Sequence, residues 1–100
     1  MVLARSTLAA IFVLALASTG FAETPEAPPG AMSCSGCHPA TRGIDTPVPR
    51  LIGRNAADIV VAMQAFRSGT RQGTVMDRIA KGFTVNEIKA IANWYAGQHD

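Results

Sequence analysis

Hydrophobic residues recur at helical spacing in the middle of the chain, between Asn55 and Gly69. Ile59, Met63 and Phe66 follow one another every three or four residues, which places them on one face of a helix. Asparagine is a favoured N-cap residue, and glycine commonly follows the last turn of a helix. The pattern therefore predicts a helix that begins after Asn55 and ends before Gly69.

A second periodic stretch lies near the C-terminus and begins with a capping-box sequence. Thr84 and Glu87 stand three positions apart, so each side chain can accept a hydrogen bond from the backbone amide of the other. The apolar face then continues toward Gly97 at Ile88, Ile91, Ala92 and Tyr95. This stretch predicts a C-terminal helix with one face in the core.

The remaining elements are short. Residues 30–38 and 75–81 predict two brief helices, the second ended by Gly82. Residues 39–54 contain five chain-breaking residues and predict a loop: Pro39, Gly43, Pro47, Pro49 and Gly53. No alternation typical of a strand and no internal repeat is present. We therefore expect an all-α fold of three to five short helices.

The N-terminus has the features of a targeting segment. Arg5 precedes a ten-residue apolar run, residues 8–17, which is too short to span a bilayer, and small residues precede a cleavage point after Ala22. Residues 1–22 are therefore predicted to be a signal peptide, with an uncleaved membrane anchor as the alternative. Cleavage would leave a 78-residue protein without a membrane span in the periplasm, with a flexible lead-in at 23–29 and one domain at 30–100.

Charge excludes one class of partner. The formal net charge of the 100 residues is only +2, and no dense basic run is present, so nucleic-acid binding is not expected. Between positions 42 and 81, however, seven cations accompany three carboxylates. That excess suits either a docking face or an ordinary solvated surface.

The strongest chemical signal is the pentapeptide Cys34-Ser35-Gly36-Cys37-His38. C-x-x-C-H is the attachment signature of a c-type haem. Two thiols one helical turn apart can each add to a vinyl group of the porphyrin, and the adjacent histidine can ligate the iron. The sequence thus predicts one covalent haem c, bound through Cys34 and Cys37, with His38 as an axial ligand.

Other uses of the same cysteines have weaker support. A thioredoxin-like pair is expected beside a βαβ pattern, and structural zinc takes four protein ligands, whereas only His99 remains as a further Cys or His. A disulfide would close a very small loop. An exported thiol-redox or metal-binding module is therefore kept as a remote alternative.

The second axial ligand decides whether the iron has an open position. Met76 follows a glycine-containing loop 38 residues after His38, far enough for the chain to cross to the opposite haem face. A thioether ligand favours ferrous iron and suits electron transfer. We predict Met76, with Met63, His99 or an open position as the alternatives.

A ligating histidine usually donates its other ring N–H to a carbonyl, which fixes its tautomer. The Pro49 carbonyl is the predicted acceptor for His38, because the loop returns there toward the haem-attachment segment. Pro47 is the alternative, and either proline can also have a purely conformational role. Of Trp94 and Tyr95, one is expected to pack on the helix that carries the thiols.

These features together resemble the class I cytochromes c: CSGCH near the start of the exported domain, Pro49-x-Leu51, Met76 and an aromatic-bearing C-terminal helix. Residues 63–91 are similar in particular to the haem subunit of flavocytochrome c sulfide dehydrogenase and to c4-type haem domains. In that subunit family, a phrase similar to Thr74–Gly82 brings in the distal methionine, which here is Met76.

The resemblance implies a class I cytochrome c fold over residues 30–100, wrapped around one haem, and an electron-transfer role without a substrate site of its own. It also implies an FAD-containing sulfide dehydrogenase flavoprotein subunit as partner in a heterodimer, with FAD only on that partner. Electrons would then pass to a soluble cytochrome. A free-standing monohaem carrier is the alternative.

Overall fold

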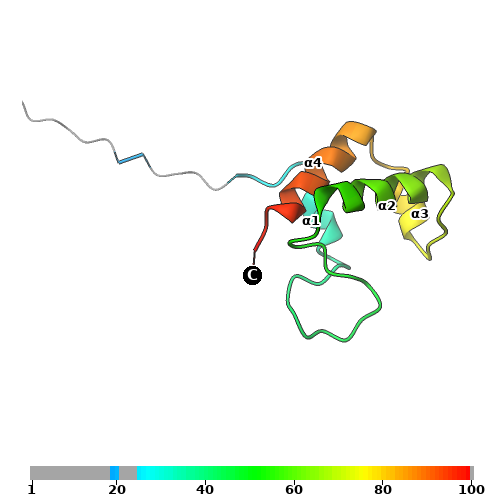
Figure 1. Ribbon diagram of the computed structural model, residues 1–100, viewed down its shortest axis with the longest axis horizontal. Coiled ribbons are helices and arrows are strands. Elements are labelled where there is room, and N and C mark those ends of the chain that lie inside the picture. The colour runs from blue at the N-terminus through cyan, green and yellow to red at the C-terminus, as the bar shows by residue number, and fades with distance from the viewer. Residues whose placement is uncertain (1–18, 21–24, 100) are drawn as a thin grey trace, which may run out of the picture.

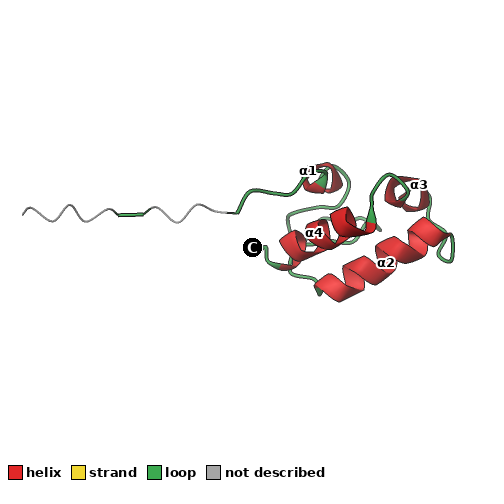
Figure 2. Cartoon of the chain, turned by 90° about the horizontal axis from the view of Figure 1, so that it is seen from above, coloured by secondary structure: helices red, strands yellow, loops and turns green. Residues whose placement is uncertain are grey.

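The computed structural model describes residues 19–20 and 25–99. It contains four helices and no strand over these residues, namely α1 (Ala31–Cys34), α2 (Ala56–Ser68), α3 (Met76–Ala80) and α4 (Val85–Ala96). The predicted all-α class is therefore confirmed (Figure 2). The predicted signal peptide at 1–22 lies, apart from two residues, outside the described part of the chain, as do residues 23–24 of the predicted lead-in and the last residue of the predicted domain.

Helix α2 begins and ends at the predicted residues. The Asn55 side chain accepts hydrogen bonds from the backbone amides of Ala57, at 2.8 Å, and Asp58, at 3.3 Å. At the other end, Gly69 has φ = 81°, in the left-handed region that glycine occupies without strain. These two local interactions set the length of the helix.

Helix α4 has the predicted capping box. The Thr84 amide donates to Glu87 Oε1 at 2.9 Å, and the Glu87 amide donates to Thr84 Oγ1 at 3.2 Å. The four positions of its predicted apolar face are all buried: Ile88, Ile91, Ala92 and Tyr95. The helix therefore packs as its periodicity indicates.

The two longer helices organise the domain. Helix α2 packs against α4 and α3, and α1 packs against α4. Figures 1 and 2 show α1 and α3 apart from each other, on the same side of the α2–α4 pair. The main cluster of buried residues comes from α1, α2 and α4 and comprises Ala31, Ile59, Ile91, Ala92 and Tyr95. None of the described helices is long and apolar enough to cross a membrane.

The short helices are shorter than predicted. Helix α1 covers only four residues of the predicted 30–38 segment, because Gly30 has φ = 85° and the chain beyond Cys34 continues as turns. Helix α3 lacks Val75 and Lys81, which occupy its N-cap and C-cap positions. Residues 39–54 contain no helix, as predicted.

Candidate functional site

The CSGCH segment forms a tight turn at the end of α1. The His38 amide donates to the Cys34 carbonyl at 2.9 Å, and the Cys37 amide donates to the same carbonyl at 3.2 Å. This turn holds two sulfur atoms and one imidazole on a single five-residue segment. Both backbone hydrogen bonds lie within this segment.

Both cysteines are free thiols. Cys34 is half-buried and Cys37 is exposed. Burial raises the pKa of the Cys34 thiol, although hydrogen bonds, including one with Tyr95, oppose the shift. Among residues 19–20 and 25–99, no group of three or more His, Cys, Asp or Glu side chains is arranged to hold a metal ion.

The His38 ring is oriented by the loop that follows it. Its Nδ1 lies 2.6 Å from the Pro49 carbonyl oxygen. A carbonyl can only accept, so the Nδ1 atom carries a proton, and in the neutral imidazole the lone pair is then on Nε2. An imidazole in this tautomer is prepared to ligate a metal through Nε2.

A second contact joins the two ends of the same loop. Arg50 Nη2 donates to the Ala40 carbonyl at 2.7 Å. The sequence reasoning did not identify this arginine, although its position directly after Pro49 was the available signal. Ala40 lies two residues after His38, and Arg50 lies directly after Pro49, so this contact is next to the His38–Pro49 hydrogen bond.

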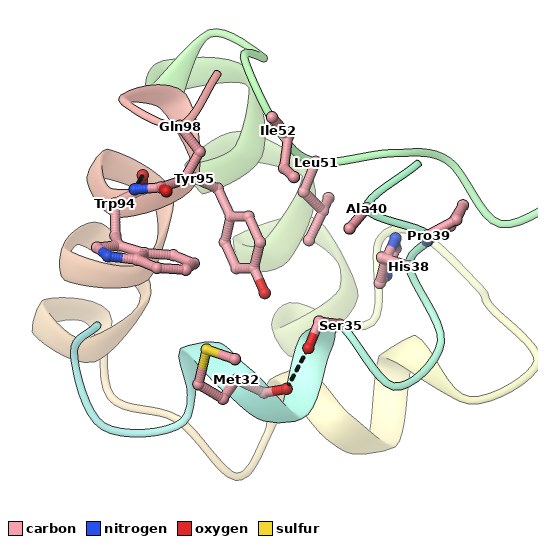
Figure 3. A pocket seen from close by; sticks show the side chains of 10 residues that line it. All are labelled: Met32, Ser35, His38, Pro39, Ala40, Leu51, Ile52, Trp94, Tyr95 and Gln98. Atoms are coloured by element: carbon pink, nitrogen blue, oxygen red, sulfur yellow. Dashed lines mark hydrogen bonds between the residues drawn. The ribbon is translucent and has the colours of Figure 1, made fainter. Parts of the chain in front are cut away.

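A cavity of about 220 Å³ borders His38 (Figure 3). It lies between the α1 turn, the start and end of the 39–54 loop, and the end of α4. The lining residues are Met32, Ser35, His38, Pro39, Ala40, Leu51, Ile52, Trp94, Tyr95 and Gln98. Neither cysteine nor Met76 lines it, so this cavity and the expected position of the sixth ligand are different places.

Tyr95 joins the haem-motif helix to α4. Its hydroxyl donates to the Ala31 carbonyl, and Figure 3 shows its ring extending from α4 toward Met32 and Ser35. The Trp94 ring packs edge-on against it, with ring centroids 4.9 Å apart and an angle of 85° between the planes. The expectation that one of these aromatic residues packs on the thiol-bearing helix is thereby confirmed. Burial raises the pKa of Tyr95, and the neighbouring Cys34 raises it further.

Met76 is the first residue of α3 and is half-buried. It lies against Gly73, where an added Cβ would be 3.4 Å from the Met76 Cβ. The alternatives lie elsewhere: Met63 packs against the buried core cluster, and His99 is exposed beyond the end of α4. The structure thus provides imidazole and thioether groups on separate short segments.

The residues present fit a haem c. Two free thiols can attach such a group, and an imidazole of fixed tautomer and a separate thioether can ligate its iron. Large apolar side chains beside both segments are also exposed, with Met32 at 62%, Val75 at 53% and Ile79 at 42%. Exposed apolar surface next to the proposed ligands is surface that a large apolar group, such as a porphyrin, can cover.

Comparison with known proteins supports this chemistry. The chain is 35% identical over 88% of its length to the cytochrome subunit of sulfide dehydrogenase of Chlorobaculum tepidum, and spans 92% of that protein. It is 36% identical over 95% of its length to the thiosulfate dehydrogenase electron acceptor of Thiomonas intermedia, and 38% identical over 69% to cytochrome c-552 of Acidithiobacillus ferridurans. It spans only 42% and 29% of these two proteins. No protein-family profile matches the chain.

Proposed function

This chain belongs to the cytochrome c family, and from that premise we propose that it is the haem subunit of a sulfide-oxidising flavoprotein complex. It is an electron carrier related to the cytochrome subunits and electron acceptors of sulfide and thiosulfate dehydrogenases. The observation that carries the proposal is the geometry of the CSGCH turn and its contact with Pro49. The Pro49 carbonyl accepts from Nδ1 of His38, which leaves the Nε2 atom available as a ligand.

In the proposed site, Cys34 and Cys37 hold one haem c through thioether bonds. When bound, this group supplies a one-electron couple between ferric and ferrous iron. His38 is the proximal ligand, kept in one tautomer by Pro49. Met76 provides the second ligand, and its soft sulfur favours the ferrous state.

The proposed partner is a flavoprotein that carries FAD and oxidises sulfide. The support is the likeness to a protein named as the cytochrome subunit of a sulfide dehydrogenase, which this chain matches over nearly its whole length. In a heterodimer of this kind, the flavoprotein would hold the substrate site, and this chain would only accept electrons and pass them to a soluble cytochrome. The proposed location is the periplasm, after cleavage of residues 1–22.

A second candidate is a role as electron acceptor for a thiosulfate dehydrogenase. It is favoured by the 36% identity over 95% of this chain to a protein of that name. The shorter match relative to that protein, 42% of its length, makes it the weaker candidate. A free-standing monohaem carrier is the remaining alternative.

Reconstitution tests the proposal. We expect the exported, matured protein to contain one haem that stays attached after denaturation and acid-acetone extraction. It should co-purify with an FAD protein at low salt, and sulfide should reduce its haem only when that flavoprotein is present. Reduction by a thiosulfate dehydrogenase without any stable flavoprotein complex would favour the second candidate. A matured preparation without a Soret band would contradict both.

A further inference from the structure

Residues 39–50 form a wide loop whose two ends meet beside His38 (Figure 1). Two hydrogen bonds close its neck. One joins His38 Nδ1 to the Pro49 carbonyl at 2.6 Å, and the other joins Arg50 Nη2 to the Ala40 carbonyl at 2.7 Å. The bonds run in opposite directions across the neck, so each end of the loop both donates and accepts.

Much of the loop between its two ends is exposed to solvent. Residues 41–45 are exposed, and Pro49 itself is exposed and has no N–H to anchor it. A local bond from the Val48 amide to Thr46 Oγ1, at 3.2 Å, stays within the loop. The residue that follows Pro49 can therefore contribute to the direction of the carbonyl.

Arg50 is that residue, and its backbone nitrogen is bonded directly to the carbonyl carbon of Pro49. The Pro49 carbonyl and the Arg50 amide belong to one planar peptide unit, so restraining the Arg50 backbone restrains the direction of the oxygen. The Arg50 side chain is half-buried and reaches back across the neck to the main chain of Ala40. A planar guanidinium suits this task, because less conformational freedom is lost for each hydrogen bond that it forms.

We propose that Arg50 is a positioning residue for the axial histidine, acting through the Pro49 carbonyl. The inference rests on the proposed function in that it takes His38 as an iron ligand. Its direct effect is to keep the Nδ1 proton of His38 in a short hydrogen bond to the Pro49 carbonyl. That bond gives the imidazole more anionic character, which stabilises ferric iron and lowers the reduction potential.

Loss of the Arg50–Ala40 hydrogen bond and loss of the Arg50 charge have opposite effects on the reduction potential of the haem. A looser Nδ1 hydrogen bond raises it, whereas removal of a nearby cation lowers it, because a positive charge opposes the extra positive charge of ferric iron. Arg50→Lys keeps the charge and removes the planar fork, and Arg50→Gln removes both. The two substitutions therefore separate positioning from electrostatics.

The experiment uses the ferrous holoprotein labelled with ¹⁵N at histidine. The chain has two histidines, so the exposed His99 serves as an internal reference for exchange with solvent. We expect exchange of the His38 Nδ1 proton to accelerate on the order of tenfold in both Arg50 variants. We also expect the reduction equilibrium constant of Arg50→Lys to rise roughly threefold. Arg54→Lys, at an exposed arginine of the same segment, is the matched control and should change neither quantity.

Unchanged proton exchange in both Arg50 variants would overturn the proposal, even if Arg50→Gln lowered the potential, because the residue would then act by charge alone. Failure of both variants to mature, with Arg54→Lys maturing normally, would also overturn it and make Arg50 a folding determinant. A wild-type protein without bound haem would instead contradict the proposed function itself.

Discussion

The hydroxyl of Tyr95 donates a hydrogen bond to the backbone carbonyl of Ala31, 2.5 Å away and separated by 64 residues along the chain. Both residues are buried, with relative exposures of 4% and 0%. Because Ala31 begins the helix that ends at Cys34, this bond fixes the haem-attachment segment to the C-terminal helix. The site therefore depends on an interaction between the two ends of the described domain.

Tyr95→Phe should destabilise the holoprotein by about 1–3 kcal/mol, because it leaves a buried carbonyl without its donor. Urea unfolding followed by far-ultraviolet circular dichroism measures this change. Asn93→Ala, at an exposed position of the same helix, is the control and should stay within about 0.5 kcal/mol of the wild type. Equal stability of Tyr95→Phe and the control would show that the bond contributes nothing net.

Met76→Ala tests the proposed sixth ligand. Removal of the thioether should abolish the weak ferric iron–sulfur band at the red end of the visible spectrum and lower the reduction potential. Met63→Leu is the matched control, since Met63 packs against the core cluster and a change of similar volume costs less than about 1.5 kcal/mol. If the band persists in Met76→Ala and disappears in Met63→Leu, the two methionines have been assigned the wrong way round.

Gly30→Ala should be severely destabilising for two reasons. Gly30 has φ = 85°, which disfavours any side chain, and an added Cβ would lie 2.5 Å from Cε1 of Phe83. Gly43→Ala separates these effects, because Gly43 has φ = 80° and nothing within 4 Å of an added Cβ. We expect Gly43→Ala to cost about 1 kcal/mol and Gly30→Ala to cost at least 1 kcal/mol more, as measured by thermal unfolding of the holoproteins. Similar losses in the two variants would mean that the Phe83 ring moves aside freely.

The helix boundaries that the sequence predicts well are those set by local chemistry. The caps at Asn55 and Thr84 each involve residues at most three positions apart, so the amino-acid pattern contains the whole interaction. The first helix is predicted too long, because Gly30 has a positive φ and the chain continues as turns after Cys34. Periodicity cannot report either.

The contacts that the sequence cannot predict are those whose acceptor is a distant backbone carbonyl. Tyr95 binds the carbonyl of Ala31, and Arg50 binds that of Ala40, and a carbonyl is present at every residue whatever its type. The Pro49 carbonyl is an exception. A ligating histidine needs an acceptor for its other ring N–H, so an acceptor for His38 could be sought in the loop that follows it. The haem motif itself is recognisable because its five residues are contiguous.

Glu87 gives the stability of the domain a dependence on acidic pH. Hydrogen bonds from the backbone and side chain of Thr84 lower the pKa of Glu87 below its ordinary value of 4.5. A carboxyl whose pKa is depressed on folding stabilises the fold above its unfolded pKa, and this contribution disappears as the pH falls through the folded pKa. The stability difference between the wild type and Glu87→Gln should therefore be constant above about pH 5.5 and shrink below pH 4.5. Urea unfolding of both proteins at a series of pH values measures it, and a difference that does not vary with pH would contradict the assigned origin of the shift.

Removal of both attachment thiols should leave the domain without a cooperative fold. Only seven hydrophobic residues are buried among those the structure describes, and three of them are alanines: Ala31, Ala80 and Ala92. So small a core supplies little more stabilisation than the chain entropy that folding removes, and a covalent cofactor compensates for the deficit. We expect Cys34→Ser/Cys37→Ser to lose most of its helical circular dichroism and its sigmoidal thermal transition. Ser35→Ala, which removes the hydrogen bond from the Ser35 hydroxyl to the Met32 carbonyl but keeps both thiols, is the control and should retain both. A double variant that still unfolds cooperatively near the wild-type temperature would show that the four helices are sufficient on their own.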